Sequence, residues 1–141
     1  MALDNLFGIA GSALNAQTSR MNSTASNLAN AGAVASAEKD AFRAKRVVFK
    51  TIMEQQTGKG DTGNQGGIRV SGISDDPKPV TRMSAPGNPM ADKDGYIFLS
   101  NVNEMTEMVE MMAAARSYQN NVEVVNTARQ LMLRTLEIIK S

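Results

Sequence analysis

The first 28 residues carry an apolar stripe with the spacing of a helix. At alternating steps of four and three residues, six of eight positions are apolar. The eight positions are Leu3, Phe7, Ala10, Leu14, Gln17, Met21, Thr24 and Leu28. Such a stripe occupies one face of a helix and is typical of a coiled-coil seam. We expect a helix that depends on packing for its stability, because Gly8 and Gly11 weaken it.

A longer stripe follows near the C-terminus, where neither Gly nor Pro occurs from residue 96 to 141. Eleven of twelve positions at steps of three or four are apolar. They are Val102, Met105, Val109, Met112, Ala115, Tyr118, Val122, Val125, Arg129, Met132, Leu136 and Ile139. The pattern predicts a helix over about residues 101–139, roughly 57 Å long. Asn101 and Glu104 have the spacing of a capping pair at its start.

The region between the two stripes has a different pattern, with β-branched and aromatic residues in short runs. Residues 42–53, 68–73 and 96–99 are strand candidates, and residues 55–67 form a polar, Gly-rich loop. All four Pro and eight of the eleven Gly fall between residues 58 and 95. These residues punctuate turns and are poorly tolerated within helices.

The predicted fold is mainly α with a small β element. Long N- and C-terminal helices form a coiled-coil-like pair, and a short β-rich insertion separates them. We divide the chain into an N-terminal helical segment (1–37), a β-rich middle (38–100) and a long C-terminal helix (101–141).

Composition argues against catalysis and against binding of nucleic acid. The 141 residues contain no Cys and no His, which removes thiol nucleophiles, imidazole bases and the usual zinc ligands. A net charge of +1 and six aromatic residues give little basis for binding nucleic acid. We expect no enzyme activity, cofactor, metal or small-molecule substrate.

Two short motifs in the middle region are better explained as loops. Residues 58–63 satisfy GxGxxG, but no helical pattern follows, as a dinucleotide site would require. Residues 92–95 (DKDG) suggest a calcium loop, but the Gly comes too early and Asn103 stands at position twelve. We interpret both as turns or flexible loops.

The N-terminal segment has too little charge for an ordinary surface helix. Residues 1–37 contain one acid and one base, Asp4 and Arg20. An antiparallel hairpin of the two helices would bury both stripes, and Met105, Met108, Met111 and Met112 could simply fill its core. One partner helix cannot cover an uncharged helix on all sides, however. The excess surface indicates packing against other subunits.

The sequence gives no sign of a membrane-spanning or cleavable segment. No run approaches the roughly 18 apolar residues of a transmembrane helix. The first five residues lack the basic charge of a secretory signal. We therefore expect any export to occur without a cleavable signal peptide.

Several segments resemble the bacterial flagellar basal-body rod proteins, and in particular the proximal-rod subunits of the FlgC family. Residues 26–31 (SNLANA) resemble the N-terminal signature shared by rod and hook components. Four further segments are more selective and follow the family's order and spacing. They are residues 42–45 with 47–49, residues 86–92 (PGNPMAD), residues 95–96 with 101–103, and residues 116–119 with 121–127.

This resemblance implies a structural subunit of the proximal rod. It implies export by the flagellar type III apparatus and polymerisation into a helical drive shaft that transmits torque. The implied location is the basal-body rod, which spans the periplasm or cell wall. The implied partners are other rod subunits, the membrane-ring/rod junction protein, the export apparatus and further copies of the chain.

We expect the seam residues of both helices to pack within and between subunits. The candidate assembly residues are Leu3, Phe7, Leu14, Met21, Asn27, Leu28, Asn30, Tyr118, Val122, Val125, Met132, Leu136 and Ile139. Asn27 and Asn30 are expected to cap the first helix or turn the chain after it.

Two other functions remain open at this stage. One is a different flagellar axial subunit of the rod or hook type, against which residues 116–127 argue. The other is a peripheral amphipathic-helix binding module. Such modules use a polar face rich in Lys and Arg, which the seam helices lack.

Overall fold

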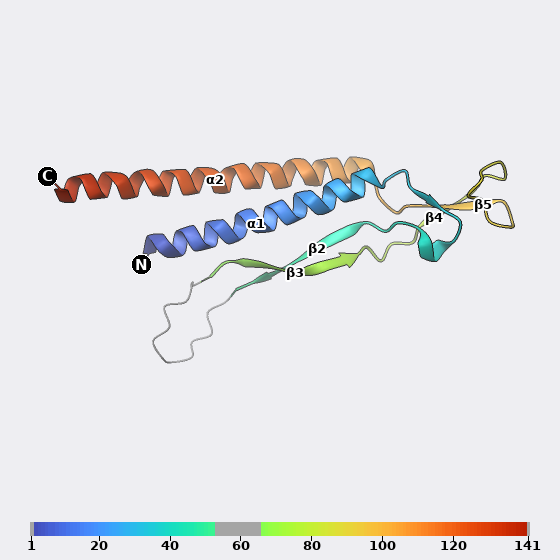
Figure 1. Ribbon diagram of the computed structural model, residues 1–141, viewed down its shortest axis with the longest axis horizontal. Helices are drawn as coiled ribbons and strands as arrows, with labels where there is room; N and C mark the ends of the chain where they lie inside the picture. Colours follow the sequence, from blue (N-terminus) through green and yellow to red (C-terminus); the bar gives the residue numbers. More distant parts are fainter. Residues whose placement is uncertain (1, 53–65, 141) are drawn as a thin grey trace, which may run out of the picture.

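The protein is an elongated molecule in which three arms extend from one end. The computed structural model describes residues 2–52 and 66–140, with the backbone alone at residues 2–4 and 139–140. Helix α1 (Ala2–Ala29) and helix α2 (Glu104–Lys140) run antiparallel (Figure 1). The third arm is a hairpin of strands β2 (Lys45–Thr51) and β3 (Ile68–Asp75). The expected loop at residues 55–67, with the GxGxxG motif, lies mostly outside the described residues.

A three-stranded antiparallel sheet closes the end from which the arms extend. Its order is β1 (Val34–Ala35), β5 (Tyr96–Leu99) and β4 (Thr81–Ser84), so β5 is central. A short 3-10 helix, η1 (Glu38–Asp40), lies in the connection between β1 and β2 of the hairpin. Because α1 leads into β1 and β5 leads into α2, this sheet joins the two helices at their inner ends.

The hairpin packs along α1, on the side away from α2 (Figure 1). Polar side chains of α1 bind its backbone at both ends. Ser12 Oγ accepts a hydrogen bond from Ile68 N at 3.1 Å, and Ser23 Oγ donates to Lys45 O at 2.9 Å. The small, uncharged face of α1 therefore holds a β-hairpin as well as a helix.

The prediction of a coiled-coil-like helix pair with a short β insertion is wrong. The chain between the helices forms five strands in two separate antiparallel sheets. The hairpin lies against α1 for much of its length, so the helices do not form an isolated pair. The fully buried residues of the two helices are also all small or polar, rather than the large apolar side chains of a coiled-coil core.

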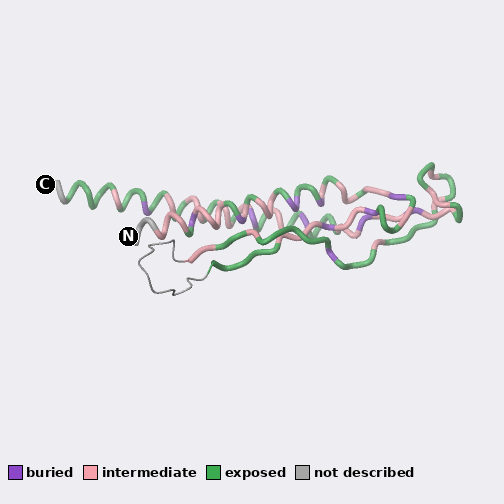
Figure 2. The backbone as a smooth tube through the Cα atoms, turned by 60° about the horizontal axis from the view of Figure 1, so that its bottom comes forward, coloured by how far each residue is buried: buried purple, intermediate pink, exposed green. Residues whose placement is uncertain are grey.

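Burial is sparse, and the buried residues lie along the helices and at the inner end that carries the three-stranded sheet (Figure 2). Five of the most buried apolar residues are alanines, four in the two helices and one directly before β2: Ala10, Ala16, Ala114, Ala128 and Ala44. The largest fully buried side chains are Ile97, Glu107 and Asn27, two of which are polar. Small side chains let the helix backbones approach closely but bury little apolar area.

Helix α2 begins at a cap other than the expected one. Asn103 Oδ1 accepts a hydrogen bond from Thr106 N at 2.9 Å, which makes Asn103 the N-cap. Asn101 instead accepts from Ala44 N at 2.7 Å and donates to Lys78 O at 2.8 Å. It therefore fixes the two connections that lead into and out of the hairpin.

The two helices differ in length, 28 residues for α1 and 37 for α2. As a result, the last turns of α2 extend beyond the N-terminus of α1 (Figure 1). We call residues 132–140 the overhang. Within the described parts of the chain, no helix is both long and apolar enough to cross a bilayer.

Candidate assembly site

None of the large apolar residues of the predicted α1 seam whose side chains the structure describes is fully buried. Phe7, Leu14, Met21 and Leu28 are each half-buried, and the side chain of Leu3 is outside the described set. The buried positions of α1 are Ala10, Ala16, Ser23, Thr24 and Asn27. They cover a wider face than the seam, because α1 contacts both α2 and the hairpin.

On α2 the inward face is turned by about one residue from the predicted seam at its N-terminal half. The line of buried or half-buried positions at its centre is Glu107, Met111, Ala114, Tyr118, Asn121, Val125, Ala128 and Met132. Tyr118, Val125 and Met132 belong to both sets, and Val122 is half-buried beside them. Leu136 is 50% exposed because α1 has ended, and the side chain of Ile139 is not described.

Met105, Val109 and Met112, which were expected on the seam, face solvent. Together with Met108 they are 51–72% exposed. On a helix of 3.6 residues per turn, these four positions lie opposite Glu107 and Ala114. We call Met105, Met108, Val109 and Met112 the outer methionine stripe. Thus α2 carries an exposed apolar stripe opposite its inward face near its start.

The two asparagines that follow the first seam have different roles. Asn30 Nδ2 donates to Ser26 O at 2.8 Å and so caps the end of α1. Asn27 does not cap the helix: its side chain accepts from Lys45 N at 2.7 Å and donates to Lys45 O at 3.0 Å. Its amide therefore pairs with β2 as a neighbouring strand would.

Asn27 also belongs to a polar cluster that joins α1, α2 and the hairpin. Asn27 Nδ2 donates to Glu107 Oε2 at 2.9 Å, and Arg46 Nη1 lies 2.8 Å from Glu107 Oε1. Arg46 Nε also donates to Asp76 Oδ2 at 3.3 Å. Glu107 is 0% exposed, so its charge is neutralised by Arg46 rather than by water. We call Asn27, Arg46, Asp76, Asn101 and Glu107 the polar cluster.

Asp76 is the member of this cluster whose ionisation is clearly perturbed. The Lys78 backbone N–H, which donates to Asp76 Oδ1 at 3.0 Å, lowers the pKa of Asp76, and the hydrogen bond and charge of Arg46 act in the same direction. Burial raises the pKa but does not reverse the shift. The carboxylate is therefore stabilised in its charged form at the base of the hairpin.

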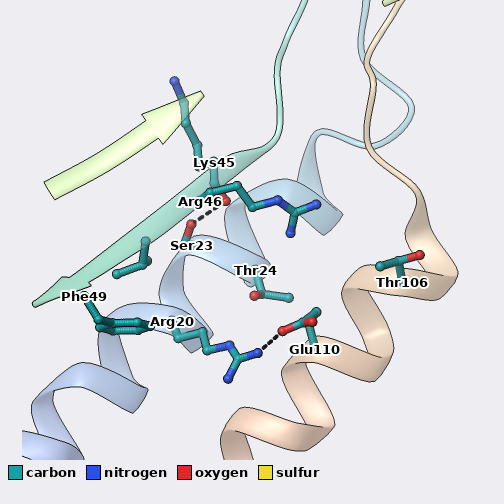
Figure 3. A pocket seen from close by; sticks show the side chains of 9 residues that line it. Arg20, Ser23, Thr24, Lys45, Arg46, Phe49, Thr106 and Glu110 are labelled. Carbon is teal, nitrogen blue, oxygen red and sulfur yellow. Dashed lines mark hydrogen bonds and ion pairs between the residues drawn. The ribbon is translucent and has the colours of Figure 1, made fainter. Parts of the chain in front are cut away.

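An open pocket of about 500 Å³ lies beside the polar cluster, between α1, β2 and the start of α2 (Figure 3). Arg20 pairs with Glu110 across it, and Lys45 pairs with Asp75 at 2.5 Å. Each of its cations, including Arg46, already has a carboxylate partner. The pocket therefore offers no excess charge to select an ion. No group of three potential Asp, Glu, His or Cys ligands occurs in the described part of the chain.

Sequence reasoning missed the polar cluster because Asn and Glu in a helix usually face solvent. A signal was present in the spacing, however. Glu107 lies seven residues before Ala114 and fourteen before Asn121, on the same face of α2. Once Ala114 and Ala128 are taken as inward positions, Glu107 must also point inward.

Comparison with known proteins identifies the family. Residues 93–138 match the family model described as the C-terminal region of the flagellar basal-body rod proteins FlgEFG. Over 98% of both chains, the sequence is 49% identical to the flagellar basal-body rod protein FlgC of Yersinia enterocolitica. The corresponding identities are 45% with FlgC of Salmonella typhimurium and 46% with FlgC of Buchnera aphidicola from Acyrthosiphon pisum, again over 98% of both chains. The chain belongs to the FlgC family of flagellar basal-body rod proteins.

Proposed function

We propose that this chain is a structural subunit of the proximal rod of the flagellar basal body. In this proposal it is exported by the flagellar type III apparatus and polymerises into the helical shaft that transmits torque to the hook and filament. Its partners are further copies of itself, other rod subunits, the membrane-ring/rod junction protein and the export apparatus. It acts on no small molecule and binds no nucleic acid.

The observation that carries this proposal is the uncovered apolar surface of α2. Leu131, Leu133 and Leu136, in and beside the overhang, are each at least half exposed. The inward face of α2 continues through Met132 to Leu136 after α1 has ended. Helices stabilise one another mainly by burying such side chains. A neighbouring helix that continued the role of α1 would bury them.

The predicted assembly residues divide between two tasks under this proposal. Those that are half-buried in one molecule, such as Leu14 and Val125, hold α1 against α2. Those at the outer ends, such as Leu3, Leu136 and Ile139, meet neighbouring subunits. Asn27 and Asn30 act within the subunit, by binding β2 and by ending α1.

The test is a single charge in the overhang. We expect Leu136→Glu to leave the unfolding midpoint of the monomer almost unchanged, since Leu136 is already half exposed, and to abolish rod assembly. Gln130→Glu, at an exposed polar position of the same helix, is the matched control and should assemble normally. Rods are scored by electron microscopy of basal bodies from a flagellated strain that lacks its own copy.

Combining Leu14→Glu with Leu136→Glu tests both tasks at once. The double variant should lose rod formation and motility completely, because one change loosens the helix pair and the other blocks its neighbours. Normal motility in this variant would remove the assignment of these residues to assembly.

A further inference from the structure

We propose that the outward face of the β2–β3 hairpin docks on the outward face of α2 in a second copy of this chain. This inference rests on the proposed function, because it names the contact through which copies of the subunit would associate. It concerns two surfaces that the fold leaves uncovered on different sides of one molecule.

The hairpin surface is marked by two bases that face each other. Lys50 and Arg69 are cross-strand partners in the β2–β3 ladder, and both are exposed. Like charges directly opposite each other destabilise a two-stranded sheet. Neither makes an ion pair with any residue that the structure describes. The pair can therefore bind an acidic group that this part of the molecule does not supply.

The orientation of this pair follows from its neighbours in the ladder. Phe49, one residue before Lys50, points towards α1 beside Arg20 (Figure 3). Successive side chains of a strand point to opposite faces. Lys50 and its partner Arg69 therefore point away from α1, on the outer side of the hairpin.

The α2 surface combines an apolar patch with an acidic residue. The outer methionine stripe faces away from α1, and Met side chains adapt to irregular partners. Glu123 lies 18 residues, or five turns, after Met105 and so continues the same line of the helix. It is exposed and forms no ion pair within the described chain.

The two surfaces lie at matching heights along the molecule. Arg46 contacts Glu107, so the start of β2 is level with the outer methionine stripe. At the other end, Leu6 lines a groove with α2 residues 120–131. Ser12 is six residues, or about 9 Å, further along the antiparallel α1, which places it level with α2 near residue 120. Because Ser12 binds Ile68 N, the Lys50–Arg69 pair is level with α2 near residue 120, about one turn before Glu123.

One molecule cannot bring these surfaces together, because the hairpin surface and the α2 surface both point away from α1, on different sides of it (Figure 1). Two copies placed side by side can, with Lys50 and Arg69 of one facing Glu123 of the next. Such a contact joins different surfaces on the two copies, so each copy keeps one free surface of each kind. Contacts of this heterologous type build rings or helical assemblies rather than closed dimers.

The direct test uses introduced cysteines, which are unambiguous because the chain has none of its own. Arg69→Cys and Glu123→Cys are combined in one chain, expressed in a flagellated strain without its own copy, and oxidised in isolated basal bodies. We expect a ladder of disulfide-linked dimers and larger species. Each single-cysteine variant is the control and should give no species larger than a dimer. Absence of the ladder, or a disulfide from residue 69 or 123 to a different rod protein, would overturn the inference.

Charge reversal gives an independent test through rescue. Lys50→Glu with Arg69→Glu should cause loss of rod assembly, and adding Glu123→Arg to the same chain should restore it. Lys39→Glu with Lys93→Glu changes the net charge equally on exposed lysines elsewhere and should have no effect. If Glu123→Arg fails to restore assembly, the inferred pairing is wrong.

The outcomes separate this inference from the proposed function. If the unmodified chain enters the rod but the cysteine pair gives no ladder, the contact is wrong and the rod function stands. If the unmodified chain does not enter the rod, the proposed function itself fails.

Discussion

Glu107 is a carboxylate inside a molecule that has almost no large apolar core. Its two oxygens are held by Asn27 from α1 and Arg46 from β2, so one side chain links three arms of the fold. Removing a carboxylate from water is costly unless a cation and hydrogen bonds compensate. The helices and the hairpin can therefore pack near their inner ends only when all three are present together.

Removing the cation should expose this dependence. We expect Arg46→Met to lower the free energy of unfolding by about 3 kcal/mol, the low end for breaking a buried pair, because Arg46 itself is 40% exposed. Adding Glu107→Gln should recover part of the loss, since the uncompensated charge disappears. Urea denaturation followed by circular dichroism measures both, with Lys93→Met as the exposed control. A double variant as unstable as Arg46→Met alone would contradict this account.

Asp76 should give the molecule a characteristic acid response. The pKa of Asp76 is lower in the folded chain than its ordinary value of 3.8. The carboxylate therefore contributes stability above pH 3.8, and this contribution is lost as the pH falls below 3.8 and through the lower pKa of the folded state. Asp76→Asn should remove that part of the pH dependence between about pH 5 and the acid transition. Thermal melts across this range measure it, and Asp94→Asn should leave the slope unchanged.

At the scale of elements, the contact between α1 and α2 depends on small side chains. Ala114 has no exposed surface and faces α1, whereas Ala113, its neighbour, faces solvent. Small residues on both helices let the backbones lie close together. The contact is consequently sensitive to added volume rather than to lost volume.

A pair of alanine substitutions tests this geometry. Ala114→Leu should destabilise the monomer by about 1–3 kcal/mol, because an inserted side chain forces the helices apart. Ala113→Leu adds the same volume on the exposed side and should stay within about 0.5 kcal/mol of the parent. Unfolding midpoints compare the two directly. Equal effects would mean that α2 is rotated from the orientation described above.

The sequence predicted those strands whose own residues have a strand-like composition. The strands expected near residues 42–53, 68–73 and 96–99 are β2, β3 and β5. β1 and β4 were missed because each is defined mainly by pairing with β5: β1 has two residues, and the sequence of β4, Thr-Arg-Met-Ser, has little strand character. Pairing between distant segments leaves little trace in a local pattern.

The predicted seam of α2 was wrong over the first half of the helix for a related reason. Large apolar side chains were taken to mark the inward face, but Met105 and Met112 are exposed while Glu107 and Ala114 are buried. Apolar side chains identify the inward face of a helix only when the opposite face is polar. Here the outward face is also apolar, so the two faces could not be distinguished by periodicity.

For the whole molecule, stability should decline along the long axis. The polar cluster, the three-stranded sheet and Asn101 tie the arms together at one end. Towards the other end, Ala128 is the last buried residue of α2 up to residue 138, and the turns after it are largely exposed (Figure 2). Segments with few buried contacts open most readily.

Limited proteolysis should follow this gradient. Among the trypsin sites in the described chain, we expect cleavage after Arg129 and Arg134 before cleavage after Lys45 or Arg46, because local opening controls access. Mass spectrometry of early time points identifies the cuts. Chains assembled into rods should resist cleavage at Arg134 because neighbouring helices would cover the overhang. Early cleavage at Arg46 in the free chain would argue against a stable polar cluster.

The unequal lengths of α1 and α2 have a mechanical consequence for a shaft built from such subunits. Where α1 ends, α2 continues, so the ends of the two helices do not lie in the same cross-section of the shaft. A twisting load that reaches the end of α1 is carried past it by the unbroken backbone of α2. The helix ends of each subunit are therefore staggered along the shaft, and no single cross-section cuts both of them.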